Sequence, residues 1–146
     1  MARIKLERVE KPLYSTTVSV TIDQINYGNH LGNDRFLSLA HEARMRFLNS
    51  INQTEMQFFD NSLIMSDAAL MFRSEVTWGE DINIHIAISD VNEYSFDLLY
   101  TFVSARDGRE VARVKTGMTA FDYQNKKLSK WNDKAQNFLK QNQIAN

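Results

Sequence analysis

One polar stretch, residues 26–36, carries the side chains best suited to chemistry. Its asparagines and its histidine, interspersed with two glycines, are Asn26, Asn29, His30 and Asn33. A histidine can exchange a proton near neutral pH. The stretch leads into the longest helical pattern of the chain, and N–H groups at a helix start can hold an anion or a polarised carbonyl. The alternative is a structural loop, in which His30 bonds the backbone and the asparagines serve turns and caps.

Two carboxylates elsewhere are candidates for a catalytic base. Glu42 follows His41 on the polar flank of the helical pattern, where a charge is usually solvated. A second subunit on that face would bury Glu42 and make it a candidate general base. Asp67 interrupts an apolar run, residues 63–72, that cannot host a carboxylate without a partner. Arg44, inside the apolar arc of the helix, is one such partner, and otherwise Asp67 is a site residue.

The helical pattern that follows the polar stretch covers residues 34–51. On a helical wheel its apolar side chains fall on one side, and its polar ones fall opposite. The apolar set is Phe36, Leu37, Leu39, Ala40, Ala43, Phe47, Leu48 and Ile51, and the polar set is Arg35, Ser38, Glu42 and Arg46. Asn33 is the predicted N-cap. The pattern predicts a helix with one buried face.

The remainder of the chain is rich in strand patterns. Residues 14–22 alternate between apolar or β-branched and small polar side chains, which is typical of a half-buried strand. Four further strands are predicted at residues 63–72, 81–91, 94–105 and 110–123, separated by turn signals such as Asp107-Gly108. Residues 53–60 favour a short helix and residues 132–143 a final surface helix. This order predicts an α+β fold with an antiparallel sheet wrapped around one long helix.

Length and composition limit the possible functions. The chain has 146 residues, and we expect one domain, residues 1–146, with an ordered core at about 14–127. Lys and Arg number 17 against 18 Asp and Glu, for a net charge of -1, so nothing attracts nucleic acid or an anionic membrane. With no signal peptide or membrane-spanning run, we expect a cytoplasmic protein.

Several catalytic and cofactor motifs are missing from the sequence. There is no cysteine, which excludes disulfides, thiolate metal sites and a cysteine nucleophile. The sequence also lacks a P-loop, a G-x-G-x-x-G motif, a G-x-S-x-G motif and histidines at metal-binding spacing. His85 stands alone on a strand, where it is predicted to be structural. We therefore expect neither a metal nor a cofactor.

The polar stretch and the helix after it resemble a known family. The sequence Asn26-Tyr27-Gly28-Asn29-His30-Leu31-Gly32-Asn33, followed by His41-Glu42-Ala43-Arg44, is similar to the hot-dog-fold acyl-CoA thioesterases of the 4-hydroxybenzoyl-CoA thioesterase type. The resemblance extends from Tyr14 to Lys127. It implies a hot-dog fold, hydrolysis of an acyl-CoA or acyl-carrier thioester, and a homodimer or dimer of dimers with active sites at the subunit interface.

The resemblance also implies roles for single residues. The main-chain N–H of Asn33 would polarise the thioester carbonyl, while Asn26 and His30 would position the substrate or a water molecule. Many members carry a catalytic aspartate where this chain has Asn26, which cannot act as a base. The base then falls to Glu42, Asp67 or, less directly, His30. Two alternatives follow: a non-hydrolytic acyl-CoA or acyl-carrier binding protein and, with a poorer motif match, a hot-dog dehydratase or hydratase.

Overall fold

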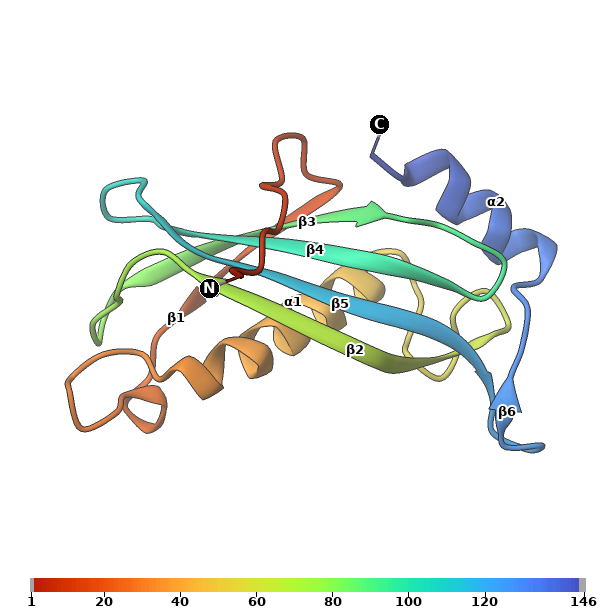
Figure 1. The fold of residues 1–146 in the computed structure, drawn as a ribbon, viewed down its shortest axis with the longest axis horizontal. Helices are drawn as coiled ribbons and strands as arrows, with labels where there is room; N and C mark the ends of the chain where they lie inside the picture. Colours follow the sequence, from red (N-terminus) through yellow and green to blue (C-terminus); the bar gives the residue numbers. More distant parts are fainter. Residues whose placement is uncertain (1, 145–146) are drawn as a thin grey trace.

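A computed structural model describes residues 2–144, and one curved antiparallel sheet organises them (Figure 1). The sheet order is β1-β3-β4-β5-β2, and the two-residue strand β6 pairs with β5. The strands are β1 (Tyr14–Ser19), β2 (Ser62–Phe72), β3 (Asp81–Ser89), β4 (Ser95–Ser104), β5 (Glu110–Asp122) and β6 (Lys127–Leu128). The four later strands are therefore confirmed. Among the described residues, β2 pairs only with β5 and forms one edge of the sheet.

The first strand is shorter than predicted. β1 ends at Ser19, and Ile22–Gln24 form a 3-10 turn, η1. Within this turn the Gln24 side chain accepts a hydrogen bond from the Thr21 N–H at 3.0 Å. Local side-chain bonding of this kind competes with strand pairing. Ile22 is consequently 73% exposed, although the alternating pattern had placed it in the sheet.

The long helix α1 (Phe36–Ser50) lies across the concave face of the sheet (Figure 1). A 3-10 turn, η2 (Asn33–Arg35), leads directly into it. The prediction of Asn33 as N-cap is wrong, since Asn33 is already the first residue of η2, and Gly32 precedes it without a side-chain cap. The predicted apolar arc is confirmed, with Phe36, Leu39 and Phe47 among its buried members.

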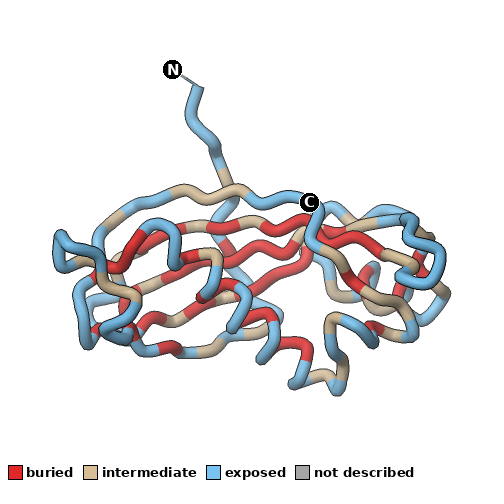
Figure 2. The backbone as a smooth tube through the Cα atoms, turned by 90° about the horizontal axis from the view of Figure 1, so that it is seen from below, coloured by how far each residue is buried: buried red, intermediate tan, exposed pale blue. Residues whose placement is uncertain are grey.

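Buried residues of the main core lie on α1 and on the long strands of the sheet, as the red segments in Figure 2 show. Alternate residues of β3 point into this core, and Ile82, Ile84, Ile86 and Ile88 are all fully buried. Each such side chain contributes roughly 1.5–3 kcal/mol by leaving water. Phe36 of α1 contacts Phe102 of β4 at a ring-centroid distance of 5.4 Å. This packing fixes the start of α1 against the sheet.

The helix predicted at residues 53–60 is absent, and that prediction is wrong. Turns occupy the segment, and Phe59 and Asp60 adopt positive φ angles of 48° and 68°. The physical reason is the burial of Phe58, which packs against Phe96 and Trp131 at centroid distances of 5.7 and 5.8 Å. Tertiary packing here overrides local helix propensity.

The C-terminal helix is confirmed as α2 (Asp133–Asn142). Its N-cap is Asn132, whose side chain accepts a hydrogen bond from the Ala135 N–H at 2.9 Å. The segment before β1 crosses the convex face of the sheet, where the Val9 N–H donates to Thr101 Oγ1 at 2.8 Å. Within residues 2–144, no helix combines the length and apolar character needed to cross a membrane.

Candidate functional site

The predicted polar stretch forms a tight loop closed by its own hydrogen bonds. The Asn26 N–H donates to the His30 carbonyl at 2.8 Å, and Asn26 Oδ1 accepts from the N–H groups of Gly28 (2.9 Å) and His30 (3.2 Å). Asn29 has a φ of 67°, which asparagine tolerates better than most residues. The Asn26 side-chain oxygen therefore holds the loop that presents His30.

A second loop, residues 73–80 between β2 and β3, lies against the first. The Leu31 N–H donates to the Val76 carbonyl at 2.8 Å. As a result His30 meets Glu75, with 3.0 Å between Nε2 and Oε2. Glu75 was not among the predicted site residues, because one acidic side chain in a charged loop carries no sequence signal. Only the sheet topology brings it to His30.

The start of η2 borders the same place. Within residues 2–144, the Asn33 N–H donates no hydrogen bond. The two loops and the helix start together line a pocket of about 350 Å³, formed by Asn26, His30, Leu31, Asn33, Phe36, Phe72, Arg73, Ser74, Glu75 and Val76. We call it the helix-start pocket. It combines an unpaired N–H donor with a histidine–carboxylate pair, a set that can polarise a carbonyl and accept a proton.

Glu42 lies away from this pocket. Its carboxylate pairs with Arg46 at 2.8 Å, and its side chain is about half exposed. Arg46 in turn donates to Thr16 Oγ1 and to the Thr17 carbonyl of β1, both at 2.9 Å. Glu42 is therefore on the β1 side of α1, and the structure does not bring it together with His30.

Asp67 points away from α1 altogether. In the register of β2 it pairs with Gly117 of β5, between inward-facing neighbours, and so lies on the convex face. Its carboxylate bonds Lys115 Nζ at 2.8 Å. The ion pair between Arg44 and Asp67, one of the two alternatives for Asp67, is not formed, because the two side chains lie on opposite faces of the sheet. A β-bulge between Met65 and Asp67 sets this orientation.

Arg44 instead joins a second histidine–carboxylate pair. His41 Nε2 contacts Glu55 Oε1 at 2.7 Å, and Arg44 Nε lies 3.4 Å from Glu55 Oε2. Arg44 Nη1 donates to the hydroxyl of Tyr100 at 3.0 Å, deep in the core. A shallow hollow of about 290 Å³ lies beside this group, between α1 and Met65 of β2.

A buried carboxylate supports the loop that carries Glu75. Glu80 is 2% exposed and accepts hydrogen bonds from the Thr77 N–H (2.6 Å), the Ser104 hydroxyl (2.9 Å) and Arg109 (2.8 Å). Burial alone would raise the pKa of Glu80. The hydrogen bonds from these donors and from the Thr77 hydroxyl outweigh it and lower that pKa to about 2.

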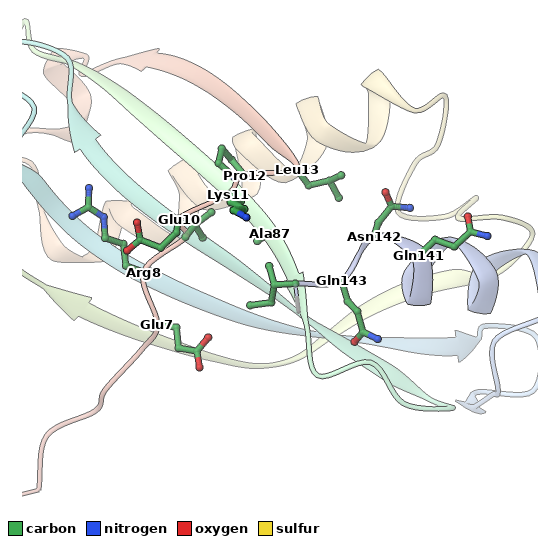
Figure 3. A pocket seen from close by; sticks show the side chains of 12 residues that line it. Glu7, Arg8, Glu10, Lys11, Pro12, Leu13, Ala87, Gln141, Asn142 and Gln143 are labelled. Atoms are coloured by element: carbon green, nitrogen blue, oxygen red, sulfur yellow. The ribbon is translucent and has the colours of Figure 1, made fainter. Parts of the chain in front are cut away.

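A larger cavity lies outside these clusters. Its volume is about 570 Å³, and it lies between residues 7–13 and residues 141–144, over Ala87 of β3 (Figure 3). Charged and amide side chains such as Glu10, Lys11 and Gln141 line it, and no predicted site residue reaches it. Among residues 2–144, no group of three or more histidine or acidic side chains could hold a metal ion.

Several solved structures have a fold similar to that of this chain. Protein SAV2348 from Staphylococcus aureus, solved in complex with CoA, is 17% identical, with a TM-score of 0.79 over 96% of this chain and 91% of that one. Slr0204 from Synechocystis, a 1,4-dihydroxy-2-naphthoyl-CoA thioesterase, is 16% identical, with a TM-score of 0.74 over 82% and 89%. YbaW from Escherichia coli, a probable thioesterase, is 16% identical, with a TM-score of 0.70 over 87% and 96%.

The sequence also matches the model of a known family. No curated protein matches the chain. The model of the thioesterase-like superfamily matches residues 20–139, which include both loops of the helix-start pocket, α1 and strands β2 to β5. The predicted hot-dog fold and thioesterase family are thereby confirmed. The chain belongs to the thioesterase-like superfamily.

Proposed function

We propose that the protein hydrolyses acyl-CoA thioesters in the helix-start pocket. The observation that carries the proposal is the presence in one pocket of the His30–Glu75 pair and the unpaired N–H of Asn33. Thioester hydrolysis needs both functions, a base for water and a donor for the developing oxyanion. The family match and the CoA complex of the similar Staphylococcus aureus protein support CoA as the thiol part of the substrate.

The proposed reaction uses a water molecule as nucleophile. His30 takes a proton from the water while the oxygen attacks the thioester carbon, and the carbonyl oxygen becomes an oxyanion that the Asn33 N–H stabilises. The tetrahedral intermediate then collapses, the C–S bond breaks, and the proton on His30 passes to the CoA sulfur. Glu75 keeps the imidazole oriented through its contact with Nε2.

Asn26 stands where many family members carry the catalytic aspartate, so another group has to act as the base. A carboxylate at that position would lie beside His30, and Asn26 instead uses its side-chain oxygen to hold the loop. Glu75 supplies a carboxylate from the neighbouring loop, 3.0 Å from His30. We therefore assign the base to His30, supported by Glu75, and no catalytic role to Glu42 or Asp67.

We also propose that two copies pair through β2. This strand is an edge of eleven residues with one side of its backbone unpaired, and Met65 and Phe72 are 40% and 45% exposed. Such an edge normally receives another strand or is covered. Phe72 also lines the helix-start pocket, so pairing there would place the pocket beside the second copy. Sedimentation equilibrium tests this proposal: a monomer at micromolar concentration would contradict it.

A thiol-release assay tests the activity. Purified protein is offered short, medium, long and aromatic acyl-CoAs, and free CoA is measured. We expect turnover of at least one substrate that Glu42→Gln leaves intact and that His30→Gln reduces strongly. Binding of acyl-CoA by calorimetry without turnover of any substrate would favour the non-hydrolytic binding protein instead.

A further inference from the structure

Glu75 lies on an exposed loop, and its position has to be fixed by something other than burial. Its side chain is 75% exposed, and within residues 2–144 its carboxylate has only His30 as an ionic partner. The main chain of the same residue is held instead. Arg109, the residue just before β5, donates a hydrogen bond from Nη2 to the Glu75 carbonyl at 2.7 Å.

The Arg109 guanidinium is itself held on several sides. Nη2 also donates to Glu80 Oε1 at 2.8 Å, and Nη1 donates to Asp107 at 3.0 Å (Oδ1) and 2.9 Å (Oδ2). Glu80 is buried and keeps its negative charge because four donors surround it. A planar guanidinium that bonds three groups, one of them the buried Glu80 carboxylate, is restricted in its orientation. The Glu75 carbonyl is therefore bonded to a rigid group.

The adjacent peptide carries the second attachment of the loop. The Val76 carbonyl accepts the Leu31 N–H at 2.8 Å, next to His30. The two consecutive carbonyls thus have different donors: the Glu75 carbonyl accepts from Arg109, and the Val76 carbonyl accepts from Leu31. Losing the Arg109 contact would leave the Glu75 peptide tethered on one side only.

We propose that Arg109 and Glu80 are positioning residues for the His30–Glu75 pair. Glu80 orients Arg109, and Arg109 fixes the Glu75 backbone so that its carboxylate meets His30. This inference rests on the proposed thioesterase function for its effect on rate, but the positioning itself is a property of the fold. Neither residue touches the helix-start pocket, and neither is a catalytic residue.

The chain offers a matched control in Arg113. Arg113 also donates to one loop carbonyl, that of Leu6 at 2.8 Å, and to one carboxylate, Glu110 Oε1 at 2.7 Å. It lies on the convex face, away from His30, and is buried to a similar degree as Arg109. Arg113→Gln therefore removes bonds of the same two kinds, with one carboxylate partner fewer than Arg109→Gln, and breaks no bond to Glu75 itself. Its partner Glu110 also lies 3.5 Å from Arg73 Nε of the second loop, a contact that does not involve Arg113.

The kinetic test compares these two variants in two backgrounds. We expect Arg109→Gln to lower kcat about tenfold with KM within about twofold, because misplacement of a reacting group acts on the chemical step. Arg113→Gln should leave kcat within about twofold, and Arg109→Lys should recover part of the loss. In a Glu75→Gln background, Arg109→Gln should cost less than about twofold, since the residue it positions is gone. An equal tenfold loss in both backgrounds would overturn the proposal.

A second measurement does not depend on turnover. Hydrogen exchange of the Leu31 amide reports whether the Glu75 loop is docked on the His30 loop. We expect faster exchange in Arg109→Gln than in wild type or Arg113→Gln. Unchanged exchange in Arg109→Gln would overturn the positioning role. Faster exchange in a protein that hydrolyses no thioester would sustain that role and reject only the proposed function.

Discussion

Within residues 2–144, two histidine–glutamate pairs have similar geometry, one beside the start of α1 and the other with its histidine inside that helix. His30 and Glu75 meet at 3.0 Å beside the helix start, and His41 and Glu55 meet at 2.7 Å farther along the helix. The second pair is the shorter and has the more buried carboxylate, so distance and burial alone would favour it. The contacts around each carboxylate favour the first pair as the reactive one.

The two pairs differ in what else contacts the carboxylate. Glu55 lies 3.4 Å from the buried Arg44, which is bonded to Tyr100, so this glutamate serves as the counter-charge of an arginine in the core. Within the described residues, the Glu75 carboxylate has no arginine partner, and it shares a pocket with an Asn33 N–H that donates no hydrogen bond. The same two residue types thus support the fold in one place and are available for chemistry in the other.

The largest expected effect separates the two histidines. His30→Gln should lower kcat by about 10²–10⁴, the usual contribution of general-base catalysis, with little change in melting temperature. His41→Gln retains a donor to Glu55 and should leave kcat within about twofold. Steady-state thiol-release kinetics measure both values. Equal losses in the two variants would remove the distinction drawn between the pairs.

The next effect separates the two glutamates by stability. Glu55→Gln leaves Arg44 buried without its counter-charge, and the free energy of unfolding should fall by about 3–5 kcal/mol. Glu75→Gln breaks a mostly exposed pair and should cost less than about 1 kcal/mol, while lowering kcat. Urea unfolding followed by circular dichroism provides the comparison. A larger loss of stability in Glu75→Gln would reverse the roles assigned here.

The smallest effect concerns the carboxylate behind the His30–Glu75 pair. The pKa of Glu80 is about 2 in the folded protein, against an ordinary value of 4.5. A lowered folded-state pKa stabilises the protein fully above pH 4.5, and this contribution, about 3 kcal/mol, is lost as the pH falls toward 2. Glu80→Gln should therefore be less stable at neutral pH and lose less on acidification. Parallel stability curves for the two proteins would contradict this assignment.

The sequence alone predicted most of the architecture. Helix α1, its buried face and most of β1 followed from periodicity, because burial on one face imposes a period of 3.6 or 2. The four later strands followed from β-branched and aromatic runs between turn signals. The end of β1 and the segment around Phe58 did not follow, since local hydrogen bonds in one case and aromatic packing in the other outweighed the pattern. The paired partner of Arg44 also required tertiary structure.

The candidate site was predicted only in its continuous half. Asn26, His30 and Asn33 lie in one stretch, and the structure brings all three to the helix-start pocket. The candidate carboxylates were chosen from their sequence context. That criterion selected Glu42 and Asp67 and missed Glu75. Glu75 lies in the loop between β2 and β3, and only the folded sheet brings that loop to His30. No local residue spacing therefore indicates it.

The bonds between the loops also set when a working site can exist during synthesis. Arg109 follows Glu75 by 34 residues and belongs to the connection between β4 and β5. A growing chain on the ribosome therefore presents the whole His30 loop long before the group that holds Glu75 has been made. Contacts of this sequence separation also form late in folding, because the entropy of loop closure comes first. A chain that has not completed its sheet thus contains His30 and Glu75 without the Arg109 contact that we propose holds Glu75 in place.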